Sequence, residues 1–319
     1  MGNVSKNIFM EIFNYFVNLS QPESDTRYAQ AAGKENIIFL VNSTKDAFAP
    51  HAGSISFKST FSGQEYFEFD KRRLAVNPQS YLLMNDGQEY ASSIDSENSV
   101  ESFTVFFATD FVTKTLLTFL QNDDYLLGNP TENVSVHSSL FFEKLYPINQ
   151  AVHNVIQSIR HQIQVNNGKD ALLLEEHLYA LLLTLLKEQK VIQDTINNLP
   201  SVRASTRQEM YRRVCKARDY MYSCYGEHIN IDILAREACL APFHFLRTFK
   251  QVFQITPHQM LTKIRLEQAQ SLLLNTEDPV AQVGISIGFD NLSSFTRLFT
   301  TAYGVSPRRF RQAQGVASK

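Results

Sequence analysis

The chain has 319 residues, of which 44% are hydrophobic and 19% are charged. This composition is typical of folded globular proteins and excludes a largely disordered chain. The length is sufficient for two domains, and no run of apolar residues is long enough to predict a membrane-spanning helix.

The net charge of −2 conceals an uneven distribution of charge along the chain. Residues 201–319 carry 16 Lys and Arg against 9 Asp and Glu, whereas residues 1–200 carry 14 against 23. A basic half is expected to bind a polyanion when it also contains a recognition motif. Glu11 and Asn14 interrupt the N-terminal apolar stretch, so we expect no signal peptide. The three cysteines lack paired metal spacing and are expected to be thiols of a cytoplasmic protein.

Residues 37–107 are expected to form β-strands. Short runs rich in β-branched and aromatic residues alternate there with Gly, Asn, Asp and Pro. The runs are IIFLV, SISFKSTF, EYFEF, SYLLM and SFTVFF. Short strands at this spacing predict an antiparallel sandwich or barrel.

Helices are expected from about residue 110 to residue 190. Asp110 is a candidate cap for a helix over 111–121, and at least one more helix is expected within 137–165. Residues 170–189 form a Leu-rich helix that is apolar on more than one face. Two interpretations remain open for it, a core helix or a dimer interface. The dimer interpretation uses Leu174, Leu178, Leu181, Leu182 and Leu185.

Residues 197–206 (NNLPSVRAST) lack apolar periodicity and are expected to be a linker. This assignment predicts an N-terminal domain over residues 1–196 and a C-terminal domain over residues 207–319.

A first helix-turn-helix pattern spans residues 230–252. A short amphipathic helix is interrupted at 239–241, and Pro242 then begins a second helix, where Pro is favoured at the first position. The second helix has an apolar stripe through Phe245 and Phe249. Its opposite side carries Phe243, His244, Leu246, Arg247 and Lys250. One apolar face and one basic face are typical of a recognition helix.

A second pattern follows about fifty residues later. Residues 278–287 form its first helix, Gly288 supplies the turn, and residues 291–302 form the second helix. One long helix over 257–274 is expected to join the two units.

Residues 231–311 resemble the DNA-binding domain of the AraC/XylS family of bacterial regulators. The resemblance rests on LAREACLAPFHFLRTFKQVFQITPHQML, RLEQAQSLLL and VGISIGFDNLSSFTRLFTTAYGVSPRRFR. The family signature of the second unit runs through Gly288, Phe289, Phe295, Arg297, Phe299, Tyr303, Gly304, Pro307, Phe310 and Arg311. The expected fold class is α+β, with an N-terminal cupin-like β-barrel domain that includes helices and a C-terminal all-α domain with tandem helix-turn-helix units.

The resemblance implies that two recognition helices enter successive major grooves of double-stranded DNA, about 34 Å apart. The residues that would face DNA are Pro242, Phe243, Leu246, Arg247 and Lys250 in the first helix, and Asn291, Ser293, Thr296 and Arg297 in the second. Arg247 is the candidate for a bidentate contact with guanine, and Phe243 and Leu246 for contacts with thymine methyl groups. Two alternatives remain open: Phe243 packs on the turn, or Arg297 contacts phosphate only.

The chain departs from the family pattern at two places. Ala241 stands where a hydroxyl side chain would cap the first recognition helix. Thr300 and Thr301 stand where the family usually has lysine, which removes phosphate partners from the second unit. We therefore expect the first recognition helix to be the stronger reader of sequence.

The strand region also resembles the small barrel of such regulators. Its aromatic residues are candidates to line a pocket, although the alternation of a strand turns half of them toward the core. These aromatic residues are Phe57, Phe61, Tyr66, Phe67, Phe69, Tyr81, Tyr90, Phe103 and Phe106. His51 is the single histidine of the strand region, so we expect no metal, no other cofactor, no catalytic residues and no enzyme activity.

The predicted function is a cytoplasmic, sequence-specific transcription regulator of the AraC family. Members of this family are more often activators, so RNA polymerase and a second copy of the chain are the expected protein partners. The sequence leaves the small-molecule effector unidentified. One alternative is a ligand-free regulator controlled by a partner protein, and another is a β-barrel enzyme fused to a DNA-binding module.

Overall fold

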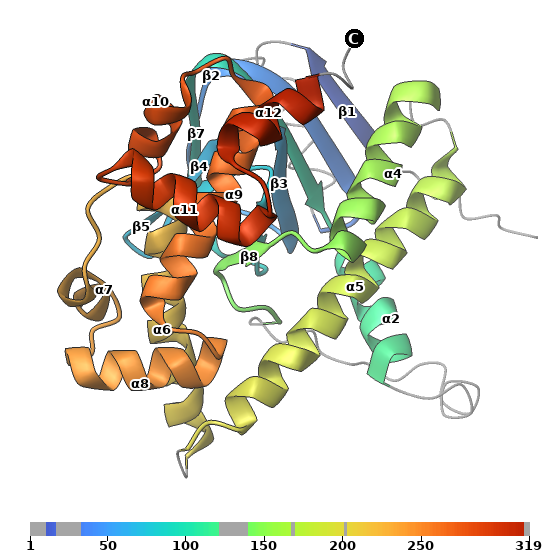
Figure 1. Ribbon diagram of the computed structural model, residues 1–319. Helices are drawn as coiled ribbons and strands as arrows, with labels where there is room; N and C mark the ends of the chain where they lie inside the picture. Colours follow the sequence, from blue (N-terminus) through green and yellow to red (C-terminus); the bar gives the residue numbers. More distant parts are fainter. Residues whose placement is uncertain (1–10, 17–32, 121–139, 167–169, 201–202, 316–319) are drawn as a thin grey trace, which may run out of the picture. The chain divides into compact units, whose positions relative to one another are not determined.

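The computed structural model describes residues 11–16, 33–120, 140–166, 170–200 and 203–315. The chain divides into two compact units, Met1–Asp194 and Thr195–Lys319 (Figure 1). Strands gather in the first unit and helices make up the second. Gln121, residues 137–139 of the expected second helix and residues 201–202 of the expected linker lie outside the described residues.

One β-sheet organises the first unit. Its strands are β1 (Glu11–Phe16), β2 (Ile37–Ala52), β3 (Ser56–Ser62), β4 (Glu65–Phe69), β5 (Arg72–Val76), β6 (Ser80–Met84), β7 (Glu89–Phe106) and β8 (Leu145–Pro147). The hydrogen-bonded order is β1-β2-β7-β3-β6-β8, and β4 pairs with β5 and β7. β1 lies parallel to β2, and the other pairs are antiparallel.

The long strand β7 curves this sheet into a barrel. Its first half pairs with β4 at Ala91–Ser93 and its second half pairs with β3, while β2 follows β7 along most of its length. The predicted fold class, α+β with an N-terminal β-barrel and a C-terminal helical domain, is confirmed. β5 was not predicted, because its sequence RRLAV begins with two charged residues.

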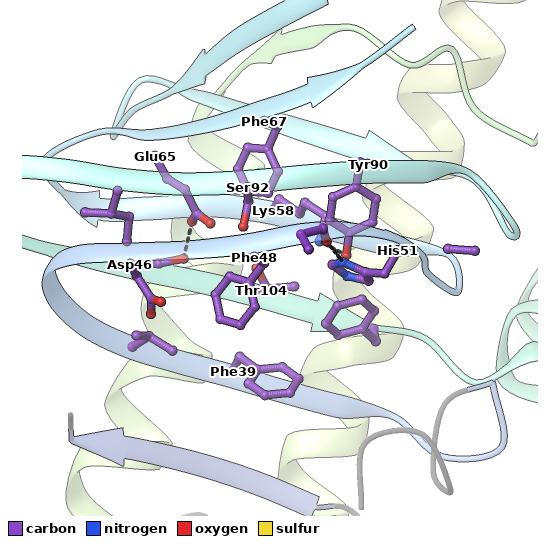
Figure 2. A pocket seen from close by; sticks show the side chains of 16 residues that line it. Phe39, Asp46, Phe48, His51, Lys58, Glu65, Phe67, Tyr90, Ser92 and Thr104 are labelled. Atoms are coloured by element: carbon purple, nitrogen blue, oxygen red, sulfur yellow. Dashed lines mark hydrogen bonds between the residues drawn. The ribbon is translucent and has the colours of Figure 1, made fainter. Parts of the chain in front are cut away.

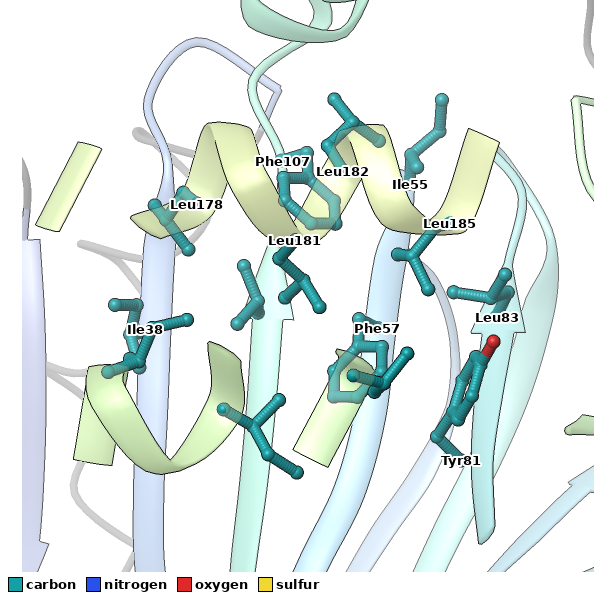
Figure 3. Close-up of a cluster of buried hydrophobic side chains, with 14 of the residues drawn as sticks. Ile38, Ile55, Phe57, Tyr81, Leu83, Phe107, Leu178, Leu181, Leu182 and Leu185 are labelled. Carbon is teal, nitrogen blue, oxygen red and sulfur yellow. The ribbon is translucent and has the colours of Figure 1, made fainter. Parts of the chain in front are cut away.

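The two faces of the strands have different roles. In β7, Ser102, Thr104 and Phe106 line a cavity inside the barrel (Figure 2). The alternate residues Phe103 and Val105 belong to the hydrophobic core that helices cover (Figure 3). This alternation is the ordinary consequence of the two-residue period of a strand.

Helices α2 (Thr109–Leu120), α4 (Gln150–Asn166) and α5 (Ala171–Asn197) contribute to that core. The carboxylate of Asp170 accepts a hydrogen bond from the backbone N–H of Leu173 at 3.1 Å and so caps α5. α5 ends at Asn197, so it continues past the expected end at Gln189 and reaches the first residue of the expected linker.

The leucines considered for a dimer interface lie in the core of their own chain. Leu174, Leu178, Leu181, Leu182 and Leu185 are at most 1% exposed, and several of them lie above Phe57 and Ile38 of the sheet (Figure 3). Side chains with no exposed surface have none to offer to a second copy. The structure therefore favours the core interpretation of this helix, and the dimer interpretation of these five residues is corrected.

The second unit consists of α6 (Ala204–Cys224), α7 (Ile231–Glu237), α8 (Pro242–Phe253), α9 (Pro257–Asn275), α10 (Val280–Ser286), α11 (Leu292–Tyr303) and α12 (Pro307–Gly315). α9 begins with a capping box, in which the Thr256 hydroxyl accepts from the backbone of Gln259 and the Gln259 side chain accepts from the backbone of Thr256. In the described part of the chain, no helix is long and apolar enough to cross a membrane.

Candidate nucleic-acid interface

α7 and α8 form the first helix-turn-helix. The turn between them bends at Cys239, whose φ of 51° lies in the left-handed region. Pro242 occupies the start of α8, and Ala241 at the cap position makes no side-chain hydrogen bond, as the sequence predicted. Phe245 and Phe249 are fully buried with ring centroids 5.4 Å apart. These two rings fix which face of α8 points outward.

The outward face of α8 carries the residues expected to bind DNA. Phe243 is 80% exposed and Leu246 is 37% exposed. Pro242, Arg247 and Lys250 are also exposed. An 80% exposed ring is not packed on the turn, so the alternative interpretation of Phe243 is wrong.

α10 and α11 repeat this arrangement. Phe295 and Phe299 are fully buried, as Phe245 and Phe249 are in α8. Counted from the cap residue, Ser293 corresponds to Phe243, Thr296 to Leu246, Arg297 to Arg247 and Thr300 to Lys250. Ser293 and Arg297 are exposed and Thr296 is half-buried.

Two features of α11 were not foreseen in the sequence. Asn291 is the cap residue, and its side-chain oxygen accepts a hydrogen bond from the backbone N–H of Ser294 at 2.8 Å. Leu292 is 47% exposed and borders a surface hollow beside Thr296 and Arg297. The position of Leu292 at the first turn of the helix, equivalent to Pro242, was the available signal.

Arg265 of the long helix α9 ties the two helix-turn-helix units together. Its guanidinium donates to the backbone carbonyls of Tyr225 at 2.9 Å and Glu227 at 2.8 Å, in the loop before α7. The same group lies against Gly288, where a Cβ would stand 2.6 Å from Arg265 Nη2. Gly288, with a φ of 87°, is the turn of the second unit. Arg265 therefore contacts a loop of the first unit and the turn of the second.

A buried ion pair supports α8 from α6. Arg218 Nη2 lies 3.0 Å from Asp219 Oδ1, and both side chains are nearly inaccessible to solvent. The Arg218 guanidinium also lies 5.3 Å from the ring centroid of Phe253, at the end of α8. A charged pair in such a dry position is costly to disturb, because removal of one partner leaves the other uncompensated.

The first unit holds a separate cavity of about 400 Å³. Of the aromatic residues considered for a pocket, Phe67, Tyr90 and Phe106 line it, whereas Phe57, Phe61, Tyr81 and Phe103 belong to or pack against the core beneath the helices. Tyr66 and Phe69 lie under the guanidinium groups of Arg73 and Arg72. Phe39, Phe48 and Lys58 were not predicted to line it.

The family model described as "Helix-turn-helix domain" matches residues 234–313. The Msm operon regulatory protein of Streptococcus mutans is 24% identical over 189 residues, covering 58% of this chain and 64% of that protein. The probable transcriptional regulator LumQ of Photobacterium leiognathi is 34% identical over 93 residues, covering 29% of this chain and 38% of that protein. The chain thus spans less than two thirds of the length of these relatives.

Among solved structures, the C-terminal domain of AraT, a response regulator from Geobacillus stearothermophilus, is 32% identical. The match covers 32% of this chain and 84% of the AraT domain, with a TM-score of 0.31. The matching family model and the regulators that share its segment agree with the tandem units seen here. Residues 234–313 are therefore a helix-turn-helix domain, similar in sequence to segments of these transcription regulators.

Proposed function

We propose that the protein is a sequence-specific transcription regulator that places α8 and α11 in successive major grooves of double-stranded DNA. The observation that carries this proposal is the repeated arrangement of the two helices. Each has a buried pair of phenylalanines behind it and a free outward face in front. A helix of this kind fits the major groove, where base edges distinguish all four base pairs.

The two helices would contribute unequally to the recognition of the DNA sequence. Arg247 presents a fork of donors suited to guanine, and Phe243 and Leu246 offer apolar contacts to thymine methyl groups. In α11 the Asn291 side chain is engaged in capping, and Ser293 and Thr296 offer only short hydroxyl groups. Arg297 has the same fork of donors as Arg247, but it suits phosphate as well as bases. α8 would therefore supply most of the specificity, and α11 would set the register.

The first unit would receive the signal. We assign sensing and dimerisation to residues 1–196, the link to 197–206, and DNA binding to 207–319. A homodimer would have to use surfaces other than the five buried leucines of α5. Action as an activator through RNA polymerase in the cytoplasm belongs to the same proposal.

Two other functions were open from the sequence. Control by a partner protein needs no cavity, so the cavity in the barrel favours a small molecule over it. A metal-dependent β-barrel enzyme would need a cluster of side chains that bind the metal. In the described residues, no three His, Cys, Asp or Glu side chains form such a cluster. The relatives matched are regulators rather than enzymes.

A footprint on promoter DNA with the full chain tests the proposal. We expect protection of two major-groove segments one helical turn apart, lost in Arg247→Ala. Lys216→Ala is the matched control, because it removes one exposed positive charge from α6 without touching α8 or α11. Equal protection by both variants would exclude α8 as the reading helix, and protection of no promoter would exclude the function.

A further inference from the structure

The cavity of the first unit is built from β2, β3, β4 and β7, on the side of the strands that faces away from the helices. Phe39, Phe48, Phe67 and Phe106 make much of its wall apolar, and polar side chains stand at particular places within it (Figure 2). Its volume of about 400 Å³ falls in the range of small-molecule sites, roughly 300–1,000 Å³.

Carboxylates mark one part of the cavity. Glu65 is buried, and Ser102 Oγ donates a hydrogen bond to Glu65 Oε2 at 2.5 Å. Figure 2 shows Asp46 on the same side of the cavity as Glu65. Burial raises the pKa of Glu65, while the hydrogen bonds of Ser102 and Ser92 and the charge of Lys58 lower it; the charge of Asp46 makes a smaller contribution that raises it. Glu65 is buried and Asp46 is half-buried, and two carboxylates on one side of the cavity favour a cation beside them.

A lysine marks another part. Lys58 is 2% exposed, and its ammonium donates to Tyr90 Oη at 2.9 Å. The ammonium lies 4.2 Å from the ring centroid of Tyr90 and 4.6 Å from that of Phe106. Burial lowers the pKa of Lys58 to about 7, although the charge of Glu65 opposes this change. Tyr90 accounts for one of the donors of the ammonium, and an acceptor in the cavity would satisfy another.

Lys58 and Glu65 line the same space without forming an ion pair in the described structure. The Lys58 ammonium donates to Tyr90, and the Glu65 carboxylate accepts from Ser102. Figure 2 shows Glu65 and Asp46 toward one end of the cavity, with Tyr90 and His51 toward the other. Buried charges are costly unless opposite charges compensate them. A molecule that carries both charges would compensate both ends together.

We propose that the cavity binds a zwitterionic small molecule of the amino-acid class. Its positively charged nitrogen lies beside Glu65 and Asp46, its carboxylate accepts a hydrogen bond from Lys58, and its apolar side chain contacts the phenylalanines of the wall. This assignment names the signal of the regulator proposed above, and it rests on that function for the consequence of binding but not for binding itself.

The first experiment is a thermal-shift and calorimetric titration of the full chain with each standard amino acid at millimolar concentration. We expect one or a few to bind. The best ligand is then compared with two analogues that each lack one charge; for phenylalanine these are phenethylamine and 3-phenylpropionate. Each analogue is expected to bind at least about tenfold more weakly, because one buried charge stays uncompensated.

Variants connect each charge of the ligand to its residue. Glu65→Gln is expected to bind the zwitterion no better than the carboxylate-only analogue. Lys58→Met is expected to bind it no better than the amine-only analogue. Lys71→Met and Glu89→Gln are matched controls at exposed positions and should retain the full preference.

The DNA footprint of the same preparations separates this proposal from the function of the protein, and circular dichroism in urea shows that the first unit of each variant is folded. If the chain protects DNA but binds no standard amino acid, the ligand class is wrong and the regulator remains. If either analogue binds as tightly as the zwitterion, the two-charge arrangement is wrong. If an amino acid binds with the expected preference but no promoter is protected, the cavity assignment stands and the function fails.

Discussion

Phe243 and Phe245 show how much two neighbouring residues of one type can differ. Phe243 is 80% exposed and Phe245 is fully buried in the same helix. We expect Phe245→Ala to lower the free energy of unfolding by about 3–5 kcal/mol. Phe243→Ala should change it by less than about 0.5 kcal/mol and yet weaken DNA binding. Urea denaturation and a DNA titration check the pair; equal losses of stability would contradict the orientation of α8.

At the scale of single residues, the sequence predicts which face of a helix a side chain lies on better than it predicts the contacts that the side chain makes. The stripe through Phe245 and Phe249 was visible in the periodicity, because helical spacing alone decides which residues share a face. The capping by Asn291, the bridge made by Arg265 and the burial of Lys58 were not, because each depends on a partner distant in the chain or on local geometry at a helix end.

At the scale of elements, the two recognition helices differ in how they begin. Ala241 gives α8 no side-chain cap, whereas Asn291 caps α11. Ala241→Ser should stabilise the unit and Asn291→Ala should destabilise it, each by about 0.5–2 kcal/mol. Chemical denaturation measures both. Asn291→Ser is the control, since serine also caps: if DNA binding still falls with stability unchanged, Asn291 contacts DNA as well.

The turn of the second unit offers a second test. In Gly288→Ala the new Cβ would meet Arg265 Nη2 at 2.6 Å and the Tyr225 carbonyl oxygen at 2.8 Å. Gly304 has a similar positive φ, but nothing lies within 4 Å of the added atom. Gly304→Ala should cost about 1–2 kcal/mol for the left-handed backbone alone. Gly288→Ala should cost more and also weaken DNA binding, because Arg265 must give up its loop contacts.

Thermal denaturation measures the stability of the Gly288→Ala and Gly304→Ala variants, and a DNA titration measures their DNA binding. Equal costs, with DNA binding unchanged, would show that Arg265 does not hold the two helix-turn-helix units in register.

The lengths of the strands were harder to predict from the sequence than their positions. β2 and β7 run on as strands through polar residues, because each supplies the hydrogen-bonding partner that the other needs, and apolar runs reveal nothing of such pairing.

At the scale of the molecule, the Leu-rich helix α5 shows what the sequence could not predict, namely the surface that covers its leucines. Its composition indicated burial on more than one face, but periodicity cannot tell whether the covering surface belongs to the same chain or to another. The structure places the sheet and the other helices of the first unit there. Two-domain organisation and the DNA-binding motif were predictable because local patterns and uneven charge encode them.

This packing predicts that the leucines govern folding of the first unit. Leu182→Ala should lower its stability by about 2–5 kcal/mol, because a fully buried side chain leaves a cavity. Leu172→Ala is the control in the same helix, since Leu172 is 75% exposed and should cost less than about 0.5 kcal/mol. Circular dichroism in urea measures both. A folded monomer from Leu182→Ala at full stability would restore the dimer interpretation.

The single strand β7 separates the cavity from the hydrophobic core of the first unit. Phe106 faces the cavity, and its neighbour Val105 faces the core that α5 covers. Any shift of this strand that widens or narrows the cavity must therefore be absorbed by the leucines on the other side. The choice of ligand can then change through substitutions at positions that no ligand touches, and a search for altered specificity should include the helix side of the barrel wall.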